Sequence, residues 1–317
     1  MKNELPKLIV ILGPTASGKT KLAVKLAMKF NGEIVSADSR QVYQEMNIGT
    51  GKDLAEYIIK TQKRKIQKQI PCHLVDIVKP NTEFNLAKYK KSALKAIKDI
   101  YTRGKIPFLV GGTGLYISAL IDNYKIPKVK PNKKIRNKLQ KLNQLEKIEM
   151  LKKLDPRCFD FIDVNNPRRV DRALEVCLSG KKFSQTRKKG QPIFNALQLG
   201  LTLPRKVLEQ KINKRVDKMI KNGLIDEVKN LIKKYGKGSA PLQTIGYAEV
   251  IDYLEGEQAL DKTIELIKTH TRQFAKRQIT WFKRDKRIKW VKNQKEAEKL
   301  IKKFLKNNNE LFLPKDL

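Results

Sequence analysis

The stretch LIVILGPTASGKTKLA, residues 8–23, decides the first element of the fold. Within it, GPTASGKT fits the spacing G-x-x-x-x-G-K-[ST] of a loop that binds di- or triphosphates. An apolar run precedes this loop and a segment with helical periodicity follows it, so the stretch predicts strand, loop and helix. Backbone N–H groups at the start of such a helix attract anions, and the helix dipole strengthens this attraction. Lys19 would add a positive charge, and the Thr20 hydroxyl would ligate Mg²⁺.

Beyond this stretch, the first part of the chain continues to alternate strands with helices. Further strands are predicted by four apolar runs, EIVSADSR (33–40), CHLVDIV (72–78), IPFLV (106–110) and LQLGLTL (197–203). Residues 86–104 between two of them predict an amphipathic helix that ends at Gly104. This alternation is typical of an α/β fold, here a P-loop NTPase-like parallel sheet flanked by helices on both faces.

Residues 123–196 break this rhythm. The segment begins with the Lys- and Pro-rich stretch NYKIPKVKPNKK and ends in the basic stretch KKFSQTRKKGQP, with short helical patterns between them. We therefore expect a mostly helical insertion domain at 123–196 and a core formed by 1–122 and 197–317. From residue 205 onward the pattern predicts helices throughout.

Composition narrows the function. The net charge is +37, which favours a polyanionic partner such as nucleic acid, although a general lysine bias of the sequence would produce the same excess.

The chain has no run of about 18 uncharged apolar residues, so no membrane span is expected. The first apolar run leads directly into the glycine-rich loop without a cleavage site, which predicts a cytoplasmic protein. The three cysteines form no C-x-x-C pair, and neither histidine completes a metal cluster.

Polar residues follow the second predicted strand in SADSRQVY, residues 36–43. Ligands of such sheets bind at the carboxyl ends of the strands, so Asp38 should face the same crevice as Lys19. A carboxylate in that place could be a general base, the N-cap of a helix or part of a Mg²⁺ shell. Asp76, near the end of another apolar run, is a further candidate metal ligand.

Three more segments carry candidate contacts. GGTGLY, residues 111–116, predicts a second strand-to-helix glycine turn in which the Thr113 hydroxyl could contact a ligand or simply belong to a tight turn. NPRRVDRALEV predicts a helix with a basic face that either grips phosphates or forms salt bridges with its own acidic residues. Residues 269–284 predict a helix on which Arg272 and Lys276 share a face, and the core is the expected place of Phe274, Trp281 and Phe282.

Taken together, the motifs resemble the tRNA dimethylallyltransferase (tRNA isopentenyltransferase) family, bacterial type. The shared motifs, in order along residues 7–290, are GPTASGKT, SADSRQVY, HLVDI, VGGTGLY, RRVDRALEV, LQTIGYAE and TRQFAKRQITWF. The resemblance implies transfer of a dimethylallyl group from dimethylallyl diphosphate to N6 of the adenosine on the 3′ side of a tRNA anticodon (position 37), with release of diphosphate. It thus implies tRNA and dimethylallyl diphosphate as partners and Mg²⁺ as the cofactor.

The resemblance also implies roles for particular residues. The catalytic group would be Asp38 as general base, Thr15 beside it and Arg272 near the diphosphate. The donor diphosphate would be bound by Gly13, Pro14, Thr15, Ala16, Ser17, Gly18, Lys19 and Thr20, with Thr20 also at the metal. Contacts to tRNA would come from Asp38, Ser39, Arg40, Gln41, Thr113, Arg168, Arg169 and Arg172.

Three other functions remain open at this point. A P-loop kinase would turn over ATP and use the insertion as a lid, but it would not need the DSRQ, GGTGLY and TRQFAKRQ motifs together. An isopentenyltransferase acting on free AMP would not need a large basic insertion. A non-catalytic RNA-binding protein would not need Asp38 beside a complete phosphate loop. The expected oligomeric state is a monomer.

Overall fold

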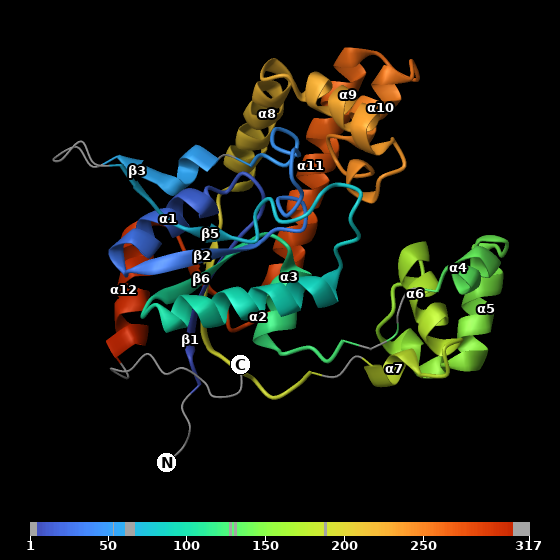
Figure 1. Ribbon diagram of the computed structural model, residues 1–317, viewed down its shortest axis with the longest axis horizontal. Coiled ribbons are helices and arrows are strands. Elements are labelled where there is room, and N and C mark those ends of the chain that lie inside the picture. Colours follow the sequence, from blue (N-terminus) through green and yellow to red (C-terminus); the bar gives the residue numbers. More distant parts are fainter. Residues whose placement is uncertain are drawn as a thin grey trace. The chain divides into compact units, whose positions relative to one another are not determined.

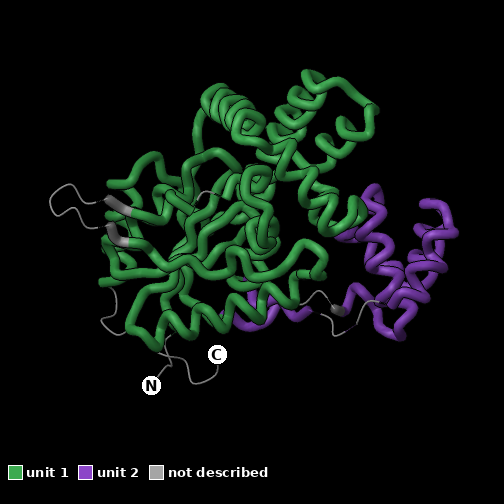
Figure 2. The backbone as a smooth tube through the Cα atoms, turned by 45° about the horizontal axis from the view of Figure 1, so that its top comes forward, with its two compact units in different colours: residues 1–121, 193–317 green, residues 122–192 purple. Residues whose placement is uncertain are grey.

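The computed structural model describes residues 5–52, 54–60, 67–126, 129, 132–186 and 189–306. The chain divides into two compact units, shown in different colours in Figure 2. Unit 1 comprises residues 1–121 and 193–317, and unit 2 comprises residues 122–192. No helix in the described residues is both long and apolar enough to span a membrane.

Unit 1 is built on a six-stranded sheet in which every neighbouring pair of strands is parallel. In spatial order its strands are β5 (Cys72–His73), β2 (Gly32–Ala37), β6 (Ile106–Gly111), β1 (Lys7–Leu12), β7 (Asn195–Leu201) and β8 (Lys289–Val291). The strand before the phosphate loop is therefore central, and β2 and β6 end close beside it. The predicted P-loop α/β architecture is confirmed.

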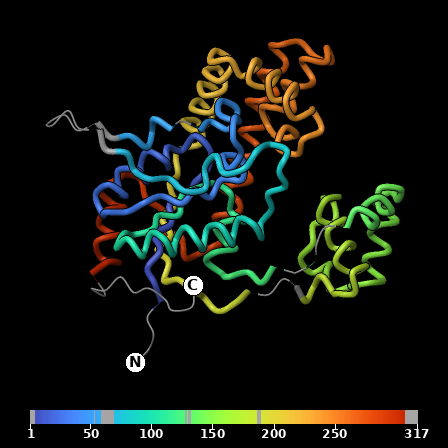
Figure 3. Tube along the Cα trace, in the orientation of Figure 1, coloured from blue at the N-terminus to red at the C-terminus, as the bar shows by residue number. Residues whose placement is uncertain are grey.

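Helices cover both faces of the sheet because alternate side chains of each strand point to opposite sides. Leu8, Val10 and Leu12 pack on one face with α2 (Leu86–Thr102) and α3 (Gly114–Ile121). Ile9 and Ile11 pack on the other face with α1 (Lys19–Lys29) and α12 (Gln294–Lys306). In Figure 3 the C-terminal helix α12 (red) lies beside α1 (blue), and Lys29 of α1 pairs with Glu298 of α12 at 2.5 Å.

A second layer of helices belongs to unit 1 and is named here the helical lobe (Figure 1). It consists of α8 (Arg205–Lys221), α9 (Leu224–Tyr235), α10 (Ala248–Leu254) and α11 (Leu260–Lys283). Residues 38–52, which follow β2 and are named here the β2 loop, bury Val42, Tyr43 and Met46 among these helices. Farther along, Leu208 and Ile212 of α8 and Ala275 of α11 pack against Ala16 of the phosphate loop. The lobe thus supports two segments of the predicted site.

Unit 2 is helical. It contains α4 (Lys133–Gln140), α5 (Gln144–Leu154), α6 (Pro167–Cys177) and α7 (Phe183–Thr186) around a small apolar cluster. Its bounds, 122–192, differ from the expected 123–196 mainly at the return to the sheet. The difference arises because Phe194 is buried in the core of the sheet and β7 begins at Asn195.

Other parts of the sequence-based prediction were wrong. The tail is not helical throughout, because Lys289–Val291 form edge strand β8 beside β7. Three residues are too short to show strand periodicity. Of the apolar run 72–78, only Cys72–His73 join the sheet. Residues 54–60 and 67–69 add a short 3₁₀ turn (Leu54–Tyr57) and an antiparallel pair, β3 (Ile58–Lys60) with β4 (Gln67–Gln69).

Candidate active site

The phosphate loop, residues 13–20, lies at the carboxyl end of central strand β1. Gly18 is left-handed (φ 85°) and directly precedes α1, which has no acidic residue in its first turn. The free N–H groups at the start of this helix therefore meet no competing carboxylate of their own helix. The Ser17 hydroxyl is buried and has no hydrogen-bond partner among the described residues. A buried polar atom without a partner is what an anion-binding loop shows before its ligand arrives.

The surroundings of Lys19 shift the pKa of its amine. Burial lowers its pKa to about 8, the carboxylate of Asp38 acts in the opposite direction, and the Arg215 guanidinium lowers the pKa further. Lys19 Nζ also lies 3.3 Å from the Pro14 carbonyl oxygen, to which it donates. A bound diphosphate would favour the charged amine, so ligand binding and protonation of Lys19 are linked.

Asp38 begins the β2 loop, directly after β2. Its Oδ1 accepts hydrogen bonds from the backbone N–H groups of Arg40 (2.8 Å) and Gln41 (3.2 Å), which fixes a tight turn. Its other oxygen, Oδ2, makes no hydrogen bond to a described residue. The carboxylate is partly exposed and close enough to influence Lys19. One oxygen thus holds the loop and the other is left for a ligand.

The glycine turn after β6 contacts the same region. Thr113 donates its backbone N–H to the Ala37 carbonyl (3.1 Å), and its Oγ1 accepts the Ser39 N–H (3.1 Å). Thr113 is therefore hydrogen-bonded to the residues on both sides of Asp38. β2, β6 and β1 are neighbours, so the three predicted motifs that follow them meet at one edge of the sheet.

Gln278 of α11 was not singled out from the sequence. Its Oε1 accepts the Thr15 N–H at 2.8 Å, and its Nε2 donates to the Gly112 carbonyl at 2.8 Å. It is 7% exposed and lies on the buried stripe of α11 with Ala275 and Phe282. A polar residue within an apolar helical stripe was the available signal.

Two arginines of the helical lobe are relevant to the phosphate loop, the expected Arg272 and Arg215, which was not singled out from the sequence. Arg272 donates to Asn213 Oδ1 and to Thr269 Oγ1, both at 2.8 Å, and pairs with no described carboxylate. Arg215 of α8 donates to the carbonyls of Thr50 (3.4 Å) and Gly51 (3.2 Å), and its charge acts on Lys19. Nothing in the sequence distinguishes Arg215 from the many basic residues of its helix.

The far end of the β2 loop is clamped to the helical lobe. Glu227 of α9 accepts the backbone N–H groups of Asn47 (2.9 Å), Ile48 (2.7 Å) and Gly49 (3.0 Å). Lys52, whose side chain is buried, donates to the Tyr43 carbonyl at 2.7 Å and pairs with Asp76. Asp76, considered above as a metal ligand, is thus engaged by a lysine.

Unit 2 carries the second basic motif. On α6, Arg168 and Arg169 are exposed and make no ion pair with a described residue. Arg172 instead pairs with the buried carboxylate of Glu175 at 2.5 Å, which Arg136 also contacts at 2.9 Å. The motif therefore combines two outward-facing arginines with one that holds the unit together.

Phe274, expected in the core with Trp281 and Phe282, is 37% exposed, and Arg277 lies over its ring at 5.9 Å. Phe282 is buried as predicted, and Trp281 is partly buried against the same cluster. The exposure of Phe274 follows from its position one residue before Ala275 of the buried stripe. Because one helical step turns a side chain by about 100°, Phe274 points away from that stripe.

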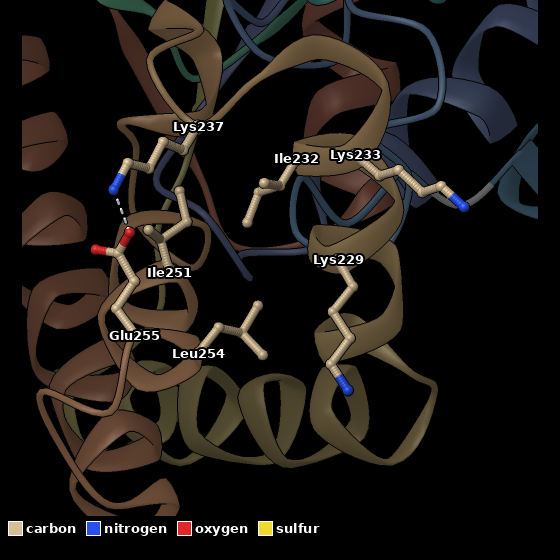
Figure 4. A pocket seen from close by; sticks show the side chains of 7 residues that line it. All are labelled: Lys229, Ile232, Lys233, Lys237, Ile251, Leu254 and Glu255. Atoms are coloured by element: carbon tan, nitrogen blue, oxygen red, sulfur yellow. Dashed lines mark hydrogen bonds and ion pairs between the residues drawn. The ribbon is translucent and has the colours of Figure 1, made fainter.

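Two other features of the described residues lie outside this site. No three His, Cys, Asp or Glu side chains of the described chain form a metal-binding group. A hollow of about 330 Å³ opens between α9 and α10 (Figure 4), lined by Lys229, Ile232, Lys233, Lys237, Ile251, Leu254 and Glu255. None of the predicted site residues lines this hollow.

These features define an α/β protein of the phosphate-loop class with a carboxylate beside the loop. A family model described as "IPP transferase" matches residues 41–285, and one described as "Isopentenyl transferase" matches residues 6–73. The chain belongs to the IPP transferase family.

Relatives extend over nearly the whole chain. A tRNA dimethylallyltransferase of Carboxydothermus hydrogenoformans is 46% identical, over 94% of this chain and 96% of its own. A crystal structure of the tRNA delta(2)-isopentenylpyrophosphate transferase of Staphylococcus epidermidis is 38% identical, with a TM-score of 0.66, covering 96% of this chain and 100% of that one. A eukaryotic dimethylallyltransferase acting on tRNA is 30% identical, with a TM-score of 0.76 over 96% of this chain and 80% of that one.

Proposed function

We propose that this protein transfers the dimethylallyl group of dimethylallyl diphosphate to N6 of the adenosine at tRNA position 37, 3′-adjacent to the anticodon, and releases diphosphate. The observation that carries the proposal is the placement of Asp38 within electrostatic reach of Lys19, at the edge where β1, β2 and β6 end. Family membership and the net charge of +37 support a tRNA acceptor. The enzyme would act as a monomer, and its tRNA substrate would place it in the cytoplasm.

The donor side needs positive charge that is already in place. As the C–O bond of the donor breaks, its electron pair goes to the leaving diphosphate, whose negative charge grows. The N–H groups of the phosphate loop, the unpaired Ser17 hydroxyl and the Lys19 amine would stabilise this charge. Arg215, and Arg272 if its side chain turns toward the loop, would add to the field.

Mg²⁺ would be held by the Thr20 hydroxyl together with diphosphate oxygens and water. The residues fit this ion, because Mg²⁺ in phosphate sites keeps several waters and needs few protein ligands. The Thr20 hydroxyl makes no hydrogen bond to a described residue, whereas Asp76 is engaged by Lys52. When bound, the ion would neutralise part of the charge on the diphosphate.

On the acceptor side, the adenine N6 must lose a proton as it attacks carbon. The N6–C bond forms while the C–O bond breaks, and the N6 proton passes to a base. Asp38 Oδ2 is the carboxylate oxygen available for that proton, since Oδ1 is occupied by the turn. Thr15, on the adjacent loop, would lie beside donor and base.

The remaining predicted residues would hold tRNA. Enzymes that modify a base take it out of the stack, so the adenine would have to flip to bring its N6 to the donor. Ser39, Arg40, Gln41 and Thr113 would contact the flipped nucleotide. From unit 2, Arg168 and Arg169 would bind the RNA backbone directly, and Arg172 less directly, because its guanidinium pairs with Glu175.

The direct test is a label-transfer assay. Purified protein, Mg²⁺ and labelled dimethylallyl diphosphate are mixed with unmodified tRNA that carries an A-A-A run beside the anticodon. AMP and ATP are offered in parallel reactions. Label in tRNA but not in AMP is the expected result. Prenylated AMP, or hydrolysis of ATP with unlabelled tRNA, would overturn the proposal.

A further inference from the structure

The amide of Gln278 joins two segments that come from different strands. Its carbonyl oxygen accepts from Thr15 in the phosphate loop, and its NH₂ donates to Gly112 in the glycine turn, both at 2.8 Å. The orientation of the amide follows from its partners, because a backbone N–H can face only the oxygen and a carbonyl only the nitrogen. Both ends of a 7% exposed side chain are thus satisfied by the backbone.

Close packing around this amide leaves little freedom. A Cβ added to Gly112 would lie 2.3 Å from Gln278 Nε2, so a larger residue would push the amide away. Packing alone would not require a glutamine, since its neighbours on the α11 stripe, Ala275 and Phe282, are apolar. The two hydrogen bonds are therefore the physical reason for a polar residue here.

The amide completes a continuous connection between the two halves of the site. The Thr15 N–H is engaged by Gln278, so the diphosphate would be bound by the other N–H groups of the loop. Gly112 is followed by Thr113, whose Oγ1 accepts the N–H of Ser39, next to Asp38. The connection runs from the donor loop through Gln278 and the glycine turn to the proposed base.

We propose that Gln278 is a positioning residue that sets the distance between the donor loop and the Asp38 turn. This inference rests on the proposed function. In that reaction the N6–C bond forms and the C–O bond breaks, with the electron pair leaving on diphosphate and the proton on Asp38. Gln278 touches none of these atoms. It acts by holding the donor loop and the base at a fixed separation, so that the reacting carbon and the N6 group that the base contacts stay near reacting distance, where a displacement of about 1 Å costs on the order of 100-fold in rate.

Two substitutions at Gln278 change its hydrogen bonds to Thr15 and Gly112 in different ways. Gln278→Met keeps the length of the side chain and removes both hydrogen bonds. Gln278→Glu keeps the acceptor for Thr15 but places a carboxylate oxygen against the Gly112 carbonyl. Gln273→Met is the matched control, because Gln273 lies on the same helix, is exposed and makes no hydrogen bond to a described residue.

The measurements are the single-turnover rate of transfer at saturating tRNA, the Kd of dimethylallyl diphosphate and of tRNA, and the free dimethylallyl alcohol formed per transfer. For Gln278→Met we expect a rate about 100-fold lower, Kd values within about fivefold and more alcohol released without transfer. Gln278→Glu should lower the rate as well, and Gln273→Met should leave it unchanged.

Two results would overturn the proposal: a wild-type rate in Gln278→Met, or a loss of donor affinity as large as the loss of rate. If the methionine variant does not fold, Gln278→Glu and Gly112→Ala decide by the same criteria at a temperature where they are folded. A wild-type protein that fails to label tRNA would refute the proposed function instead, so the two failures are distinguishable.

Discussion

The ring of Tyr247 lies so close to Gly49 that a Cβ on Gly49 would be 2.5 Å from the ring atoms Cε2 and Cζ. The Tyr247 hydroxyl donates to Glu227 Oε1 at 2.8 Å, and Glu227 accepts the Gly49 N–H at 3.0 Å. Glycine, tyrosine and glutamate thus form one clamp on the β2 loop. Tyr247 belongs to the LQTIGYAE motif, and this contact shows what the tyrosine of that motif does in the structure.

Gly49→Ala should displace the β2 loop, since the ring of a 1% exposed tyrosine cannot move aside. We expect a cost of about 1–3 kcal/mol in the free energy of unfolding, typical of overpacking. Transfer activity should fall with it, because the same loop begins at Asp38. Urea unfolding and the label-transfer assay check both, with Gly238→Ala, which has open space around it, as control. Equal stability of the two variants would contradict the clamp.

Asp38→Asn keeps the shape of the turn, since an amide oxygen can still accept from Arg40 and Gln41. It removes the base, so the single-turnover rate of transfer should fall by about 100-fold or more. Binding of tRNA should stay within a few-fold of wild type. Gel-shift titration and rapid-quench kinetics measure the two quantities, and intact transfer would remove Asp38 from the mechanism.

Donor binding should depend on pH through Lys19. Burial lowers its pKa to about 8 in the free protein, so the amine is charged below and neutral above that pH. Because the diphosphate binds the charged form, its affinity should weaken as pH rises through about 8, by up to about tenfold per unit. Calorimetric titration from pH 6.5 to 9.5 measures the Kd. The Lys19→Met variant shows how the Kd changes with pH through ionisation of the diphosphate alone. If wild type and variant give the same pH dependence of the Kd, Lys19 is not the group responsible.

The arginines of α6 should separate into two classes. Replacing the exposed Arg168 and Arg169 together by Ala should weaken tRNA binding. The slope of log K against log salt should become shallower by an amount that corresponds to about two phosphate contacts, and the stability of the protein should not change. Arg172→Ala should instead destabilise the protein by about 1–2 kcal/mol, because Glu175 is buried and loses one of its two arginines. Filter binding at several salt concentrations and thermal melting distinguish them. A melting change in the double variant would contradict this division.

Glu33 offers a test of stability away from the site, near the start of β2. Burial would raise its pKa, but hydrogen bonds from Arg103, Lys105 and His73 outweigh this and hold the pKa at about 2. A lowered pKa stabilises the fold above the ordinary carboxyl pKa of 4.5, and that contribution disappears as pH falls toward 2. Glu33→Gln should therefore cost about 2 kcal/mol at pH 7 and progressively less below pH 4.5. Activity at pH 7 should not change.

Much of the site could be anticipated because it depends on local sequence. The phosphate loop needs a strand, a left-handed glycine and a helix start in immediate succession, and these occupy residues 7–29. Asp38 lies at the end of one predicted strand, and Thr113 comes shortly after another. In a parallel sheet the carboxyl ends of the strands lie on one edge, so sequence position alone places both near Lys19.

Other residues were not accessible to that reasoning. Gln278 lies 263 residues from its partner Thr15, and Glu227 lies 178 residues from Gly49. Arg215 is one basic residue among many on α8. Their roles depend on how the helical lobe packs against the edge of the sheet, and no periodicity in a single segment encodes that packing.

The sequence by itself therefore determined which features of the site occur and in what order along the chain. They are the phosphate loop, the carboxylate after β2, the glycine turn after β6 and the helical insertion. Each follows from short-range backbone geometry and from the alternation of apolar residues. Only the tertiary structure decided which side chains hold these pieces at working distance. Hydrogen bonds such as those of Gln278 and Glu227 form between segments far apart in the chain, and they exist only once hydrophobic packing of the lobe and the sheet has brought those segments together.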